Sequence, residues 1–117
     1  MKRAHRSLAA WQKSVDLVEA VYAATKSFPK DELFGLTSQM RRAAVSVPAN
    51  IAEGAARSGT KELMYFVSIA SASLSELDTH IEIARRLGYL NDDALTKKTD
   101  EVAGIVLGLS TSIKRKL

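Results

Sequence analysis

The pattern of hydrophobic and polar residues along this 117-residue chain predicts four helices. In four segments, apolar side chains recur at alternating spacings of three and four, which is typical of a helix with one buried face. No segment alternates apolar and polar residues over a length that favours a strand. We therefore expect an all-α protein that forms a single domain over residues 1–117.

The same pattern predicts which face of each helix is buried. The first face holds Leu8, Trp11, Val15, Val18, Tyr22 and Thr25, the second Met40, Ala44, Val47, Ile51 and Ala55, the third Leu63, Phe66, Ala70, Leu74, Leu77, Ile81, Ala84 and Leu87, and the fourth Leu95, Val102, Ile105, Leu109 and Ile113. Short connections are expected near residues 28–36, 58–60 and 88–92, the last with Gly88 as a left-handed helix cap. Connections this short favour an antiparallel, up-down-up-down four-helix bundle.

The second helix contains a proline, Pro48, in its interior. An interior proline removes one backbone donor and costs about 3 kcal/mol, and it usually kinks the helix. We expect residues 37–57 to form one continuous helix that is kinked at Pro48. A helix-turn-helix around residues 50–66 is disfavoured, because Ala56 and Arg57 occupy its corner and the following helix is too long.

The remaining faces of the second helix suggest two kinds of contact. A polar stripe consists of Arg42, Ser46, Asn50, Glu53 and Arg57. A second apolar face consists of Val45, Ala49, Ala52 and Ala56. Because a helix that is apolar more than halfway round is normally buried on both sides, we expect this second face to pack in a homo-oligomer. The stripe either holds satisfied polar groups at the kink or serves as an interface or recognition surface.

Basic residues concentrate at one end of the expected bundle. In the up-down-up-down arrangement, that end carries Lys2, Arg3, Arg6, Arg57, Lys61, Lys114, Arg115 and Lys116, against only Glu53 and Glu62. Its charge exceeds the +4 of the whole chain, so it should attract polyanions in a salt-dependent way. We expect no aromatic residues among these basic ones, which favours contact with backbone phosphates over base stacking. Alternatively, these residues only solubilise the chain termini.

No catalytic, cofactor-binding or metal-binding residues are predicted. The chain has no cysteine, and its histidines are His5 and His80. Glu76 and His80 stand four residues apart, a spacing that favours a surface contact over a metal site. Trp11 and Tyr22 are interpreted as core anchors. With no signal-peptide core and no apolar run of about 18 residues, the protein is expected to be cytoplasmic, without a membrane partner.

The runs "FPKDELFGLTSQMRRAAVSVPANIAEGAAR" and "LAAWQKSVDLVEAVYAAT" identify a resemblance that covers nearly the whole chain. They resemble the four-helix-bundle family, also called the ribosomal-RNA intervening-sequence protein family. The resemblance implies a cytoplasmic homopentamer, related to retroelement accessory variability proteins that bind nucleic acid and a reverse transcriptase. Ser71-Ala72-Ser73 departs from an expected arginine-glycine-serine run, which weakens any hydrogen-bond network through Ser73 and Glu76. Ala55 stands where an aromatic residue is common.

These observations favour a non-enzymatic, homo-oligomeric binding or scaffold protein. Its expected partners are further copies of the chain, with RNA, DNA or a nucleic-acid-binding protein at the basic end. The alternatives are a purely structural or protein-docking assembly without a nucleic-acid role and, less favoured, an enzyme with a small pocket near the Pro48 kink.

Overall fold

The computed structural model describes residues 3–117. A short 3₁₀ helix, η1 (Ala4–Ser7), precedes α1 (Ala9–Thr25), and a second, η2 (Lys30–Glu32), precedes α2 (Leu36–Ala55). They are followed by α3 (Thr60–Arg86) and α4 (Ala94–Lys114). Residues 3–117 contain no strand, so the prediction of an all-α chain with four long helices is confirmed.

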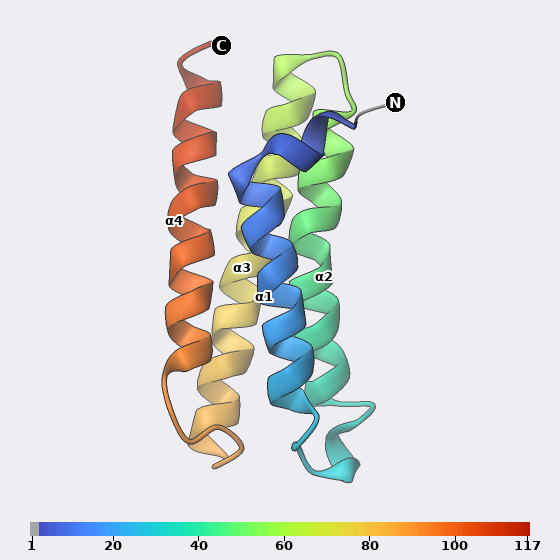
Figure 1. Cartoon of the computed structure of the whole chain (residues 1–117), viewed down its shortest axis with the longest axis vertical. Coiled ribbons are helices and arrows are strands. Elements are labelled where there is room, and N and C mark those ends of the chain that lie inside the picture. The colour runs from blue at the N-terminus through green and yellow to red at the C-terminus, as the bar shows by residue number, and fades with distance from the viewer. Residues whose placement is uncertain (1–2) are drawn as a thin grey trace.

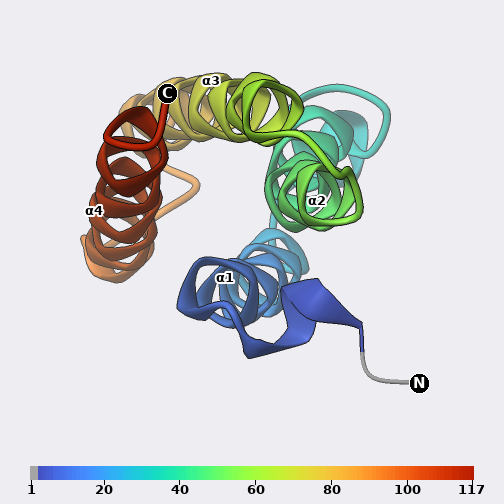
Figure 2. The same cartoon turned by 90° about the horizontal axis from the view of Figure 1, so that it is seen from above.

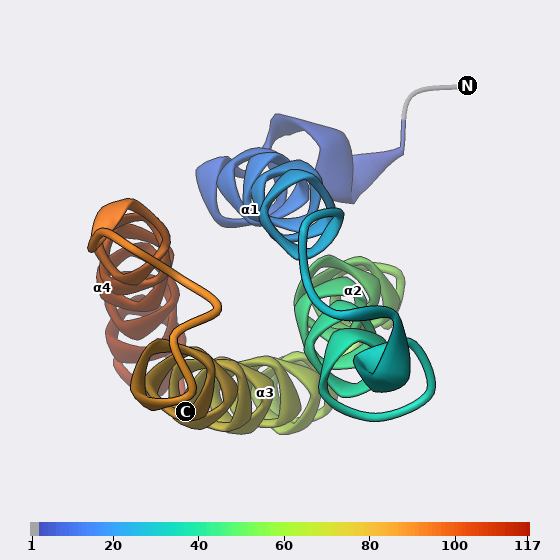
Figure 3. The same ribbon diagram turned by 90° about the horizontal axis from the view of Figure 1, so that it is seen from below.

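The four helices form a rod that measures 44 × 27 × 19 Å. η1 and the end of α4 lie with the α2–α3 connection at one end of this rod, and the other two connections lie at the opposite end (Figure 1). We call the opposite end the far end. Viewed along the rod, α1 packs against α2 and α4, and α3 packs against the same two helices (Figures 2 and 3). Each helix therefore has two neighbours and turns one face to a shared core.

α2 is continuous through Pro48, so the chain does not reverse direction there. Pro48 is itself buried among the apolar positions of this helix. Met40, Ala44, Val47 and Ile51 are completely buried, as the spacing predicts. Ala55 is only partly buried, at the end of the helix.

The predicted buried face of α1 is wrong, because most of the residues that are buried stand one position before the predicted ones. The structure buries Ala10, Ser14, Leu17, Val21 and Thr25. Tyr22 is 41% exposed, and the Arg41 guanidinium lies 4.5 Å from its ring centroid, so Tyr22 is not a core anchor. Ser14 can face the core because its hydroxyl donates to the Trp11 carbonyl at 2.9 Å. Small side chains at positions 10 and 14 also let α1 approach its neighbours closely.

Two positions predicted to lie on the third helix, Leu87 and His80, also differ from the prediction. Leu87 is exposed near the far end. His80, expected to make a surface contact with Glu76, is instead buried, and its Nδ1 atom has no hydrogen-bond partner among residues 3–117. A buried imidazole on an apolar helix face looks the same in sequence as an exposed one, because only the packing of the other helices decides which it is.

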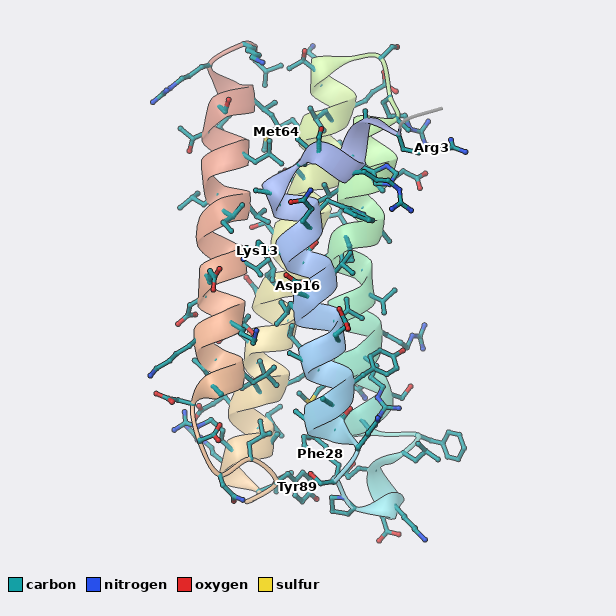
Figure 4. The ribbon with its side chains drawn as sticks, in the orientation of Figure 1. Arg3, Lys13, Asp16, Phe28, Met64 and Tyr89 are labelled. Carbon is teal, nitrogen blue, oxygen red and sulfur yellow. The ribbon has the colours of Figure 1, made fainter. Side chains whose placement is uncertain are left out.

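The end of α3 is capped by a Schellman motif, and the predicted left-handed Gly88 is confirmed by its φ of 81°. The Gly88 amide donates to the Arg85 carbonyl at 3.0 Å, and the Tyr89 amide donates to the Ala84 carbonyl at 2.9 Å. This turn aims the Tyr89 ring toward Phe28 in the α1–α2 connection, with ring centroids 5.3 Å apart (Figure 4). The two connections at the far end are thereby packed together.

Glu32 completes this contact between the two far-end connections. One carboxylate oxygen accepts a hydrogen bond from the Tyr89 hydroxyl at 3.0 Å. The other accepts from the Leu36 amide at 3.2 Å and so satisfies a free donor at the start of α2. The hydrogen bond to Glu32 raises the pKa of Tyr89 above its ordinary value of 10.0.

This hydrogen bond predicts a stability that falls at alkaline pH. Above pH 10 the unfolded chain loses the Tyr89 proton while the folded chain still holds it, so stability falls until the higher folded pKa is passed. Tyr89→Phe should lower the melting temperature at pH 7 and reduce the additional fall above pH 10. Thermal melts followed by circular dichroism test this, and an unchanged alkaline fall in the variant would contradict it.

Candidate nucleic-acid interface

The predicted basic residues that the structure describes belong to segments that meet at the end opposite the far end. Arg3 lies beside the upper turns of the bundle in Figure 4. Arg57 belongs to the α2–α3 connection and Lys61 to the first turn of α3, while Lys114 ends α4 (Figure 1). We call this end the basic end; its described members are Arg3, Arg6, Arg57, Lys61, Lys114, Arg115 and Lys116, and all are exposed. Lys2 lies outside the described residues.

Arg57 is held in place by contacts on two sides. Its guanidinium Nη2 lies 3.0 Å from Glu53 Oε1, one helical turn earlier. The same guanidinium lies 5.1 Å from the centroid of the Phe66 ring on α3. A guanidinium has five N–H donors, so these contacts leave donors free for an anion. Glu53 offsets part of the positive charge of Arg57 and limits what this residue adds to the field of the basic end.

Arg6 is placed by the packing of η1 onto α1. Its guanidinium lies 5.2 Å from the Trp11 ring centroid, and the His5 ring lies 4.9 Å from the same centroid. The Gln12 side chain donates to the Arg6 carbonyl at 2.7 Å. These contacts hold the backbone of η1 beside the first turn of α1 and present the Arg6 side chain to solvent.

Aromatic residues therefore do lie among the basic residues, contrary to the expectation from sequence. Trp11 stacks with Arg6, and Phe66 stacks with Arg57. Tyr65, beside Phe66, is 63% exposed. In sequence Trp11 and Phe66 belong to apolar helix faces, and each of the two pairs joins residues of two structural elements. A linear scan for mixed basic and aromatic runs does not find them.

The residues of the polar stripe of α2 make two separate sets of contacts, one around Ser46 and Asn50 and one between Glu53 and Arg57. The Asn50 amide donates to the Ser46 carbonyl at 2.8 Å and to the Ser46 hydroxyl at 2.9 Å. The hydroxyls of Ser46 and Ser73 are hydrogen-bonded at 2.9 Å, which joins α2 to α3. Ser73 thus takes part in a network despite its unusual neighbours in sequence. Arg42 stays exposed, and Glu53 pairs with Arg57.

The second apolar face of α2 points away from the bundle. Val45 is 42% exposed, Ala49 and Ala56 are exposed, and Ala52 is partly buried. Near Val45 the surface is hollowed over about 610 Å³, between α1, α2 and the connection that joins them. Phe34, in that connection, is 93% exposed and lines the hollow. Its exposure was not foreseen, because Phe34 stands in a loop outside any periodic face.

The same hollow extends along the part of α2 that precedes Pro48. It therefore lies where the enzyme alternative requires a small pocket. Arg41 lines it, but its Nε donates to the Thr25 hydroxyl at 2.9 Å, and its guanidinium stacks on Tyr22. Within residues 3–117, no group of three or more histidine, aspartate or glutamate side chains is placed to hold a metal ion. Over the same residues, no helix combines the length and the apolar character that crossing a bilayer requires.

Most of the chain matches a known protein family. The family model described as 23S rRNA-intervening sequence protein matches residues 6–109. This range includes α1, α2, α3 and most of α4. No curated protein matches the chain.

Proposed function

Since this chain belongs to the 23S rRNA-intervening sequence protein family, we propose that it is a non-enzymatic, homo-oligomeric binding protein whose basic end contacts nucleic-acid phosphates. The proposal takes the helices as an antiparallel, up-down-up-down bundle with α2 kinked at Pro48. It places the protein in the cytoplasm as a homopentamer, which is the assembly that the family resemblance implies.

The observation that carries the proposal is the gathering of basic residues from separate segments at one end of the rod. Arg3 and Arg6 come from the start of the chain, Arg57 and Lys61 from the region between α2 and α3, and Lys114 from the last turn of α4. Clustered positive charge binds phosphates and releases their counterions, so affinity falls steeply as salt rises. In a ring of like-oriented subunits, these surfaces would lie side by side and their fields would add.

A salt series tests the contribution of the basic end. Lys114→Glu, Arg115→Glu and Lys116→Glu, combined in one variant, should lower the affinity for duplex DNA and structured RNA by about tenfold at low salt. The slope of log affinity against log salt should fall by about 0.9 for each duplex phosphate that the variant no longer neutralises. Fluorescence anisotropy at several salt concentrations measures both quantities.

The matched control reverses three exposed lysines toward the far end: Lys26→Glu, Lys30→Glu and Lys98→Glu. It changes the net charge of the chain by the same amount but leaves the basic end intact. Equal reductions in affinity for the two variants would assign the binding to net charge rather than to this end. Absence of binding by the unaltered protein at low salt would refute the proposal.

A further inference from the structure

A shallow hollow of about 330 Å³ at the start of α3 combines cations with aromatic rings. It is lined by Arg57, Lys61, Glu62, Tyr65 and Phe66. The residues belong to the α2–α3 connection and the first two turns of α3, at the upper end in Figure 1. The hollow is therefore part of the basic end.

The rings of the hollow are arranged so that one stays open to a ligand. Tyr65 and Phe66 meet edge to face, with centroids 5.1 Å apart and an interplanar angle of 84°. Phe66 is partly buried and packs beneath the Arg57 guanidinium, whereas Tyr65 is 63% exposed. The Tyr65 ring thus contributes little to the core, and its neighbour restricts the space in which it can turn.

Two cations flank this exposed ring. Lys61 stands four residues before Tyr65 on α3, so the two side chains share one face of the helix. Arg57 is kept at the edge of the hollow by Glu53 and Phe66. Glu62 lines the hollow and Glu53 pairs with Arg57 beside it, so the net attraction for phosphates comes from the remaining cations of the basic end, while Lys61 and the free donors of Arg57 supply the local contacts.

We propose that Tyr65 is a stacking platform for an unpaired base of single-stranded nucleic acid, with Lys61 and Arg57 contacting the adjacent phosphates. An exposed ring beside cations is the combination that single-strand binding proteins use, and duplex bases are not available to stack on it. This inference rests on the proposed function, which concerns phosphate contact alone. It adds a preference for unpaired strands and assigns that preference to one residue.

The test uses a short single strand that carries 2-aminopurine, whose fluorescence is quenched when the base stacks on a ring. The unaltered protein and Tyr65→Phe should both quench this signal, because each keeps an aromatic ring. Tyr65→Leu should abolish the quenching and weaken single-strand binding by about fivefold to a hundredfold. Duplex affinity should change less than about twofold, because phosphate contacts are retained. Circular dichroism checks that each variant is folded.

Several outcomes overturn the inference. They are persistent quenching in Tyr65→Leu, equal weakening of single-strand and duplex binding, and duplex binding without single-strand binding. Unchanged single-strand binding, together with the disappearance of a co-purifying protein, would instead assign Tyr65 to protein docking. In each case, the proposed function stands as long as the Lys114, Arg115 and Lys116 reversal weakens duplex binding more than the control reversal of Lys26, Lys30 and Lys98 does. If that reversal has no effect, the proposed function fails, whatever Tyr65 does.

Discussion

Gly54→Val is expected to lower the free energy of unfolding by about 3 kcal/mol, the upper end of the usual cost of overpacking. At Gly54, α2 and α3 approach so closely that an added Cβ atom would lie 2.9 Å from the Phe66 Cβ and 3.3 Å from the Leu63 carbonyl oxygen. Neither atom is the end of a flexible side chain, so the helices themselves have to separate. Chemical denaturation of the variant and the unaltered protein, at equal protein concentration, measures the difference.

Gly104→Val is the matched control for this prediction. Gly104 lies within α4, and an added Cβ there meets nothing within 4 Å. Both substitutions replace a helical glycine by valine, so intrinsic helix propensity changes equally and cancels in the comparison. Gly104→Val should change stability by less than about 0.5 kcal/mol. Similar effects at both positions would show that close packing at Gly54 is not what requires glycine.

The second large effect concerns assembly. Phe34→Asp combined with Val45→Asp is expected to convert the proposed homopentamer into single chains of 12.7 kDa. Phe34 and Val45 are 93% and 42% exposed and line one hollow, whose other apolar residues are Leu33 and Tyr22. Exposed apolar surface marks interaction sites, and replacing both side chains by carboxylates removes the apolar contact and adds charges that an interface would have to desolvate. Light scattering coupled to size-exclusion chromatography gives the mass directly.

Leu107→Asp is the control for assembly, because Leu107 is an apolar residue of α4 that is 67% exposed. It adds the same kind of charge outside the hollow and should leave the assembly intact. The unaltered protein should have about five times the mass of one chain. A single-chain mass for that protein, or dissociation by Leu107→Asp alone, would contradict the proposed interface.

The local rules of helix formation explain why much of the fold could be predicted. Periodic apolar residues place Met40, Val47 and Ile51 in the core, and Gly88 ends α3 as its position suggests. The face of α1 was misassigned because alanine and serine carry little hydrophobic signal. Ala10 and Ser14 are buried for their small size, a requirement set by the neighbouring helices rather than by α1 itself.

The candidate site was harder to predict, because its chemistry depends on contacts between elements. The helix order was enough to bring the basic residues to one end, since it determines which helix ends meet. The stacking of Arg57 on Phe66 depends instead on how α3 turns against α2, which leaves Phe66 only partly buried although the pattern places it on the buried face. The periodic pattern predicts the rotation of a helix about its axis only to within about one residue. An error of that size is enough to place a ring in the core by prediction when it lies at the surface, as for Tyr22.

The positions of η1 and of the end of α4 affect how fusion proteins should be designed. Both lie at the basic end, so an affinity tag or fluorescent protein attached next to either one would crowd that surface (Figure 1). A polyhistidine tag would also bring its own titratable groups close to the surface that is proposed to contact phosphates. Insertion of a short peptide label at Asn91–Asp93, in the exposed α3–α4 connection, keeps the reporter at the opposite end of the 44 Å rod.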